Sequence, residues 1–185
     1  MIISLIGFMG CGKSSVGKEL KRLLSCDLVD LDDYVEAMTG RTISEIFETE
    51  GEAAFRQLEW QALNEIFQSY PQIVDNSEKE EIDLILSLGG GTLTQEAAAK
   101  LVKEKSLCFY LRASVDELVA DLEGRTENRP LLRGYDLRQR VEELFSSRSV
   151  LYEKSADIIV DVDGLLYHEI AEKITDKINC GPSIR

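Results

Sequence analysis

The chain has 185 residues, of which 44% are hydrophobic and 30% are charged, a balance typical of a globular protein with one sizeable core. Its formal net charge of −13 argues against general nucleic-acid binding, because basic surface supplies most of the affinity for phosphate backbones. No apolar stretch approaches the roughly 20 residues of a membrane span, and no basic leader precedes the first apolar run, so we expect a cytoplasmic protein.

A complete phosphate-binding motif lies near the N-terminus. Residues 7–14 read Gly-Phe-Met-Gly-Cys-Gly-Lys-Ser, after a strand-like apolar run at Ile2–Ile6 and before a helical pattern that starts near Val16. Its glycines let backbone N–H groups surround a phosphate at a helix N-terminus. We expect Lys13 to contact the outer phosphates and the Ser14 hydroxyl to bind Mg²⁺. The motif therefore predicts a nucleotide site.

Two carboxylates follow the second predicted strand, Leu28–Val29. Asp30 and Asp32 come directly after it, and ligands of a parallel sheet bind at the carboxyl ends of the strands, where the phosphate loop also lies. On an extended chain, residues i and i+2 point the same way. We expect one carboxylate to approach Mg²⁺ and the other to face a hydroxylated substrate. The structural alternative is that Asp32 or Asp33 caps the next helix.

Helical patterns fill the next segment of the chain. Gly40 and Gly51 are expected to bound a short helix, which Thr42-Ile43-Ser44-Glu45 opens as a capping box. A longer helix is predicted from Gly51 to about Gln68, with Arg56 away from its apolar face. A guanidinium suits carboxylates and phosphates, although a single arginine is more often a surface residue. The acidic stretch 70–83 is expected to be a solvated connection.

Three glycines end the next buried run. Residues 84–88 are apolar except Ser87, and Gly89, Gly90 and Gly91 follow them. Residues without a Cβ let a ligand approach the backbone closely, with N–H groups free to donate, so we expect substrate contact here. Many phosphate-loop proteins carry a metal-binding aspartate on this strand. Because Ser87 stands there instead, Asp30 is the better candidate for the carboxylate near Mg²⁺.

Arginines are concentrated in the last third of the chain. Strand-like runs recur at Leu107–Leu111 and Ile158–Val160, and Ser114-Val115-Asp116-Glu117 is a second capping box. Between them, residues 124–134 lack apolar periodicity and are rich in Arg, Asn and Pro, which is typical of a mobile lid over a nucleotide. Arg129 in this lid and Arg148 beyond it are further candidate anion ligands.

Apolar, strand-like runs alternate with helical patterns along the whole chain. The runs are nearly continuous in apolar residues rather than alternating with polar ones. This arrangement predicts an α/β fold in which a parallel sheet is covered by helices on both faces.

Together these motifs resemble one family, shikimate kinase. The resemblance runs from Ile3 to about Val160. It rests on the loop Gly7–Ser14, Asp30-Leu31-Asp32, Phe55-Arg56 with Glu59, Gly89–Gly91, the segment from Arg125-Thr126 to Arg129-Pro130-Leu131-Leu132, and Arg148 with Tyr152. Ser15 stands where many relatives have threonine, and the acidic connection near Glu78 is longer than usual; neither touches the proposed chemistry.

The resemblance implies a fold and a reaction. The fold would be a single three-layer P-loop kinase domain. It would have a five-stranded parallel sheet in the order 2-3-1-4-5, a substrate-binding helical region at about 32–68 and a mobile lid at about 124–134. The reaction would be Mg²⁺-dependent transfer of the ATP γ-phosphoryl group to the 3-hydroxyl of shikimate, a step toward chorismate and the aromatic amino acids. The family usually works as a monomer, so we expect one here.

The resemblance also assigns roles to residues. Asp32 would grip the shikimate hydroxyls and accept the proton of the attacking one, while Lys13 and Arg129 would neutralise the transferring phosphoryl group. The remaining assignments are ATP binding by Gly10, Cys11, Gly12, Lys13, Ser14, Ser15, Arg125 and Arg129, shikimate binding by Asp32, Arg56, Gly89, Gly90, Gly91 and Arg148, and Mg²⁺ binding by Ser14 and Asp30. Arg125 would pack near the adenine.

Two other functions remain possible from the sequence alone. A gluconate kinase-like enzyme of the same fold would also use arginines to bind a carboxylate, although the two aspartates with the triple glycine favour shikimate. A non-catalytic nucleotide-binding protein would be expected to lack Lys13, Asp32 or Arg129, and all three are present.

Overall fold

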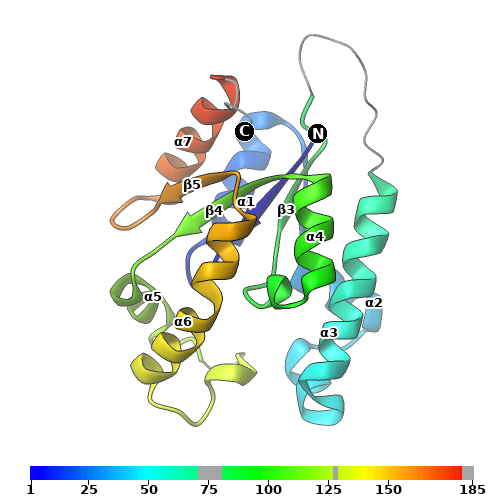
Figure 1. Cartoon of the computed structure of the whole chain (residues 1–185), viewed down its shortest axis with the longest axis vertical. Coiled ribbons are helices and arrows are strands. Elements are labelled where there is room, and N and C mark those ends of the chain that lie inside the picture. Colours follow the sequence, from blue (N-terminus) through cyan, green and yellow to red (C-terminus); the bar gives the residue numbers. More distant parts are fainter. Residues whose placement is uncertain (71–80, 127–128, 181–185) are drawn as a thin grey trace.

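Five parallel strands form a single sheet in the order β2-β3-β1-β4-β5 (Figure 1). A computed structural model describes residues 1–70, 81–126 and 129–180. The strands are β1 (Ile2–Ile6), β2 (Asp27–Asp30), β3 (Leu84–Ser87), β4 (Leu107–Arg112) and β5 (Ile158–Asp161). Each predicted strand is present, within two residues of its expected bounds. The α/β class and the strand order are confirmed.

Helices cover both faces of the sheet. On one face, α1 packs against α7 and contacts β1, β2 and β3, while α4 and α6 lie on the opposite face against β4 (Figure 1). The helices are α1 (Lys13–Leu24), α2 (Leu31–Thr39), α3 (Ile43–Ser69), α4 (Glu96–Lys105), α5 (Val115–Leu122), α6 (Leu137–Ser155) and α7 (Tyr167–Asn179), with short 3₁₀ turns η1 (Thr92–Thr94) and η2 (Pro130–Leu132). No helix within the described ranges is long and apolar enough to cross a membrane.

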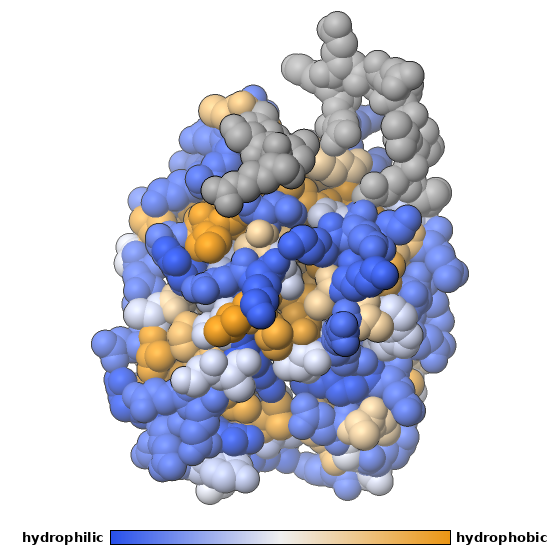
Figure 2. Space-filling view, in the orientation of Figure 1, coloured by the Kyte–Doolittle hydropathy of each residue, from blue (hydrophilic) through white to orange (hydrophobic). Residues whose placement is uncertain are grey.

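The central strands supply the middle of the core. All five residues of β1 and all four of β3 are buried, and so are four of the six residues of β4. Burial on both faces explains why these strands read as continuous apolar runs in the sequence. The outer surface is different: the face seen in Figure 2 is mostly hydrophilic, with hydrophobic residues in small separated groups.

One predicted helix boundary is a kink rather than a break. Gly40 ends α2 in a left-handed conformation, and Thr42 opens α3 with the predicted capping box, reciprocated by Glu45. At Gly51, φ is +81°, yet the helix continues on the far side to Ser69. A glycine adopts this conformation without the Cβ clash that other residues suffer, so the chain bends here without unfolding the helix.

Only one of the two hydrogen bonds of the second predicted capping box forms. The Ser114 hydroxyl accepts a hydrogen bond from the Glu117 N–H, but the Ser114 N–H donates to Asp163 Oδ1 at 2.8 Å. Asp163, which follows β5, therefore takes the place that the Glu117 carboxylate would have in a full capping box. Most of the acidic connection, at 71–80, and part of the lid, at 127–128, lie outside the described residues.

Candidate active site

The phosphate loop joins β1 to α1 and leaves the start of that helix free for a ligand. Gly10 and Gly12 have φ of +88° and +89°, and no side chain caps the N-terminus of α1. Its first N–H groups are therefore available for an anion. The Lys13 ammonium is nearly buried and donates to the carbonyl oxygens of Gly7 (3.0 Å) and Phe8 (2.9 Å). These bonds hold its charge within the loop.

A cavity of about 200 Å³ opens beside this loop, and we call it the donor cavity. Its wall includes the predicted residues Gly10, Gly12, Lys13, Ser14, Ser15, Asp30, Asp32, Arg125 and Arg129. Cys11 does not line it, because its side chain is 5% exposed and packs in the core. Asp121 and Tyr167 also border the cavity; the sequence carried no motif that pointed to either.

Asp30 makes two hydrogen bonds, and the one from the Asp32 N–H shows that Asp30 caps α2, which was not predicted from the sequence. Its Oδ2 accepts a hydrogen bond from the Ser14 hydroxyl at 2.5 Å, and its Oδ1 accepts one from the Asp32 N–H at 3.1 Å. Helix α2 begins at Leu31, so the two aspartates do not lie on an extended chain. The helix cap is Asp30, rather than Asp32 or Asp33, because the strand turns into the helix without a loop.

The Ser14–Asp30 pair has the chemistry of a magnesium site. Both groups offer hard oxygen ligands at the mouth of the donor cavity, and Asp30 pairs across the sheet with the buried Ser87. Mg²⁺ commonly takes one or two carboxylates and completes its shell with water and substrate phosphates. Within the described residues, no cluster of three or more His, Cys, Asp or Glu side chains offers a fuller cage.

Asp32 borders a second cavity as well as the first. This acceptor cavity, of about 100 Å³, has a polar wall that includes Asp32, Arg56, Glu59, Arg129 and Arg148. Burial, together with the nearby carboxylates of Asp30 and Glu59, raises the pKa of Asp32 to about 7. A carboxyl group with this pKa is poised to exchange a proton near neutral pH.

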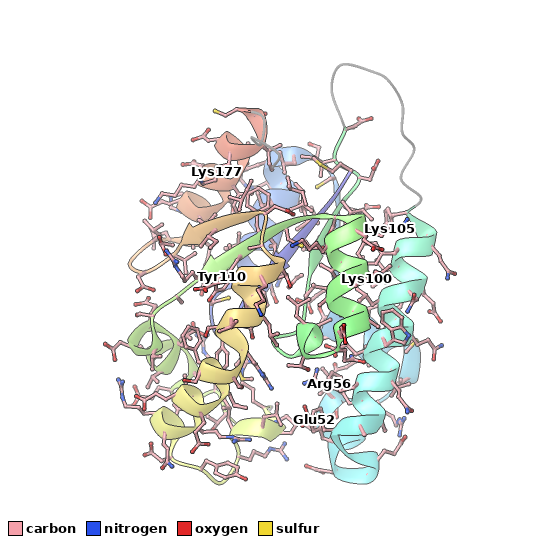
Figure 3. All side chains as sticks on the ribbon, in the orientation of Figure 1. Glu52, Arg56, Lys100, Lys105, Tyr110 and Lys177 are labelled. Carbon is pink, nitrogen blue, oxygen red and sulfur yellow. The ribbon has the colours of Figure 1, made fainter. Side chains whose placement is uncertain are left out.

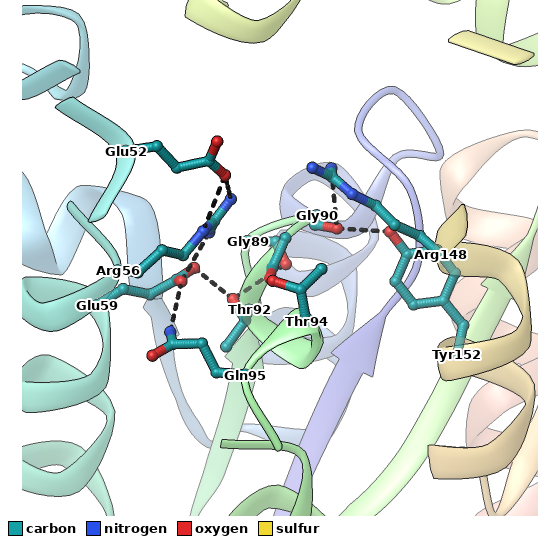
Figure 4. Close-up of polar contacts among 11 residues, drawn as sticks. Glu52, Arg56, Glu59, Gly89, Gly90, Thr92, Thr94, Gln95, Arg148 and Tyr152 are labelled. Atoms are coloured by element: carbon teal, nitrogen blue, oxygen red, sulfur yellow. Dashed lines mark hydrogen bonds and ion pairs between the residues drawn. The ribbon is translucent and has the colours of Figure 1, made fainter. Parts of the chain in front are cut away.

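Two arginines reach the acceptor cavity from different helices; Arg148 is buried and Arg56 is half-buried. Arg56 projects from α3 toward the interior of the molecule (Figure 3) and Arg148 from α6, on opposite sides of the glycine turn that follows β3 (Figure 4). The rest of the wall is the glycine turn and a set of apolar residues: Gly89, Gly90, Gly91, Met9, Ile43, Phe47, Phe55, Pro130 and Leu131. Cationic, acidic and apolar walls together suit a small ligand that combines an anionic group, hydroxyls and an apolar face.

A network of ion pairs and hydrogen bonds holds Arg56 in position. Its guanidinium pairs with Glu52 at 3.0 Å and with Glu59 at 2.7 Å. Glu59 is fully buried and also accepts hydrogen bonds from the Thr92 hydroxyl (2.5 Å) and from the Gln95 amide (3.3 Å). No role for Glu59 was predicted from the sequence. The spacing could have pointed to it: Glu59 follows Arg56 by three residues on a helix, and a buried carboxylate needs a cationic partner at such a distance.

Comparisons with known proteins point to a single family. A sequence model described as shikimate kinase matches residues 9–179. A shikimate kinase of Dictyoglomus turgidum is 37% identical over 95% of this chain and 96% of its own length, and one of Thermodesulfovibrio yellowstonii is 40% identical over 93% and 91%. The structure of a shikimate kinase from Acinetobacter baumannii in complex with shikimate matches with a TM-score of 0.86 and 31% identity, over 100% of this chain and 95% of that one.

Proposed function

Because this chain belongs to the shikimate kinase family, whose members are ATP-dependent kinases that phosphorylate an alcohol group of shikimate, we propose that it transfers the γ-phosphoryl group of ATP to the 3-hydroxyl of shikimate. The observation that carries the proposal is the place of Asp32. This carboxylate borders both cavities, so it can contact a hydroxyl of the acceptor at the point where the donor phosphate arrives.

In the proposed complex, the acceptor cavity holds shikimate by its carboxylate and hydroxyls. Arg56 and Arg148 bind the carboxylate, since both line the cavity with little exposure to solvent and a largely desolvated guanidinium–carboxylate pair is strong. The backbone of Gly89–Gly91 provides a floor without side chains, and the apolar wall packs against the carbon ring. Shape and charge together then bring one hydroxyl toward Asp32.

Asp32 accepts the proton of the attacking hydroxyl in this proposal. Its pKa of about 7 leaves a substantial fraction ionised at neutral pH and keeps it basic enough to assist the transfer. Phosphoryl transfer depends mainly on alignment and charge neutralisation. Lys13 and Arg129, which border the donor cavity, supply positive charge for the transferring phosphoryl group.

On the donor side, the loop from Gly10 to Ser15 binds the phosphates of ATP, Cys11 through its backbone, and Arg125 lies near the adenine. Ser14 and Asp30 would hold Mg²⁺, which neutralises phosphate charge when it is bound. The lid would be residues 124–134 and the substrate-binding region residues 32–68, within one domain. We further propose that the protein is a cytoplasmic monomer that binds neither nucleic acid nor membranes.

The test is a panel of hydroxy acids, including shikimate, quinate and gluconate, assayed with ATP and Mg²⁺ through coupled release of ADP. We expect turnover with shikimate at the highest kcat/KM. A preference for gluconate would favour the gluconate kinase-like alternative. ATP binding without any product would favour a non-catalytic nucleotide-binding protein. Omitting Mg²⁺ and adding a chelator tests the metal separately, and we expect activity to be lost.

A further inference from the structure

One buried tyrosine contacts the site without lining either cavity. The Tyr152 hydroxyl donates to the carbonyl oxygen of Gly90 at 2.5 Å, across the space between α6 and the glycine turn (Figure 4). Tyr152 is 2% exposed and lies one helical turn after Arg148. Residues four apart on a helix share a face, so these two side chains approach the glycine turn together.

The ring of Tyr152 is held in place by packing. It contacts the ring of Tyr110 on β4, with 5.3 Å between the ring centroids. Burial raises the pKa of the Tyr152 hydroxyl well above its usual range, so the group stays protonated and remains a donor at every working pH. Removal of the oxygen alone would therefore leave the packing of the ring and remove the hydrogen bond to Gly90.

Arg148 and Tyr152 share the same acceptor. One Arg148 Nη lies 3.4 Å from the Gly90 carbonyl oxygen, a longer contact than that of the tyrosine. Gly90 also borders both cavities, and its Cα lies so close to the phosphate loop that an added Cβ would come within 3.0 Å of the Met9 nitrogen. A shift of this carbonyl would thus move the contact with Arg148 and change the shape of the floor of the acceptor cavity.

We propose that Tyr152 is a positioning residue of the acceptor site, a role that rests on the proposed function. Its hydroxyl holds the Gly90 carbonyl and satisfies that oxygen, which leaves the Arg148 guanidinium for the carboxylate of the acceptor. Without the hydroxyl, the carbonyl oxygen is left with the arginine as its side-chain donor among the described residues. The guanidinium is then drawn toward the backbone, and the acceptor carboxylate competes for it.

The test is Tyr152→Phe, assayed with wild-type protein. We expect the KM for shikimate to rise about fivefold, the size expected for one neutral hydrogen bond. The kcat and the KM for ATP should stay within about twofold, because neither Asp32 nor the phosphate loop is touched. The matched control is Tyr110→Phe, which changes a hydroxyl on the partner ring and should leave the KM for shikimate unchanged.

A second substrate separates positioning from general loosening. Shikimate methyl ester lacks the carboxylate charge, so Tyr152→Phe should change its kcat/KM much less than that of shikimate. An unchanged KM for shikimate, an equal loss with the ester, or the same loss in Tyr110→Phe would overturn the proposal. If wild-type protein failed to phosphorylate shikimate, the proposed function would fall instead. Calorimetric titration of shikimate into both proteins would then still decide whether Tyr152 supports binding.

Discussion

The donor and acceptor cavities are built in different ways. The donor cavity is formed around one continuous segment, residues 7–15, whose backbone and helix N-terminus face the ligand. The acceptor cavity is formed by side chains from α2, α3, η2 and α6 around the glycine turn. The first depends on local conformation, and the second depends on the whole fold.

This difference separates the effects of mutations. Changes in the acceptor cavity should weaken shikimate binding or slow transfer while ATP affinity is kept. This separation can fail at the residues that border both cavities, which are Met9, Asp32, Gly90 and Arg129.

The largest effect is expected for Asp32→Asn. The amide cannot accept the hydroxyl proton, so kcat should fall by about 100-fold or more. The Kd for ATP, measured by titration calorimetry, should stay within about twofold, because the phosphate loop is unchanged. Asp33→Asn is the matched control, since that neighbour is exposed and lines neither cavity. A collapse of ATP affinity would place Asp32 in the metal site.

The next effect is expected for Arg56→Ala. Removal of a half-buried guanidinium from a carboxylate site should raise the KM for shikimate by about 10- to 100-fold, with the KM for ATP nearly unchanged. Arg41→Ala is the control, because it removes a surface ion pair with Glu50 in the same region. Loss of the Glu59 pair should also lower stability, so circular dichroism must show that the variant is folded. A KM equal to that of the control would contradict the assignment.

The two cavities also differ in how much of each could be predicted from the sequence. The phosphate loop was predictable because its function lies in a contiguous pattern, and the strands because burial on both faces leaves continuous apolar runs. The grouping of Arg56 with Arg148 came from the family resemblance, because 92 positions of chain separate them and no local pattern joins them. Asp30 as the helix cap was missed, since the pattern does not show that α2 begins without a loop.

The pH dependence of kcat/KM is a second test of Asp32 as the proton acceptor. With a pKa of about 7, its carboxylate is protonated progressively below neutral pH, so kcat/KM for shikimate should fall about tenfold per pH unit below that value. This fall in kcat/KM at low pH should be absent in Asp32→Asn. The affinity for ATP should not change over the same pH range. A profile that is flat down to pH 5 would contradict the role of Asp32 as the proton acceptor.

The stability of the protein should depend on the same pKa, but it should decrease with rising pH where activity increases. Because the folded pKa of Asp32 is raised from 3.8, the folded protein binds more protons than the unfolded chain between about pH 4 and 7. This group's contribution to the free energy of unfolding therefore decreases as pH rises through that window. Asp32→Asn removes the buried charge, so its Tm should exceed that of wild type at pH 8, and the difference should shrink toward pH 5. Equal Tm differences at both values would argue against a raised pKa.

The smallest effect is expected for Gly91→Ala, and it tests how closely the acceptor cavity is fitted. Gly91 has an ordinary φ of −111°, so alanine causes no backbone strain there, but its Cβ would overlap the Arg56 guanidinium. The guanidinium is the end of a flexible side chain and moves aside, which should raise the KM for shikimate a few-fold. Because the phosphate loop keeps its conformation, the KM for ATP should stay constant. The Tm should fall by less than in Arg56→Ala, because the displaced guanidinium weakens its pair with Glu59 but is not removed. In the double variant with Arg56→Ala the added methyl should cost almost nothing, since the group it displaces is gone. Independent, additive losses would show that Gly91 acts on shikimate by another route than Arg56.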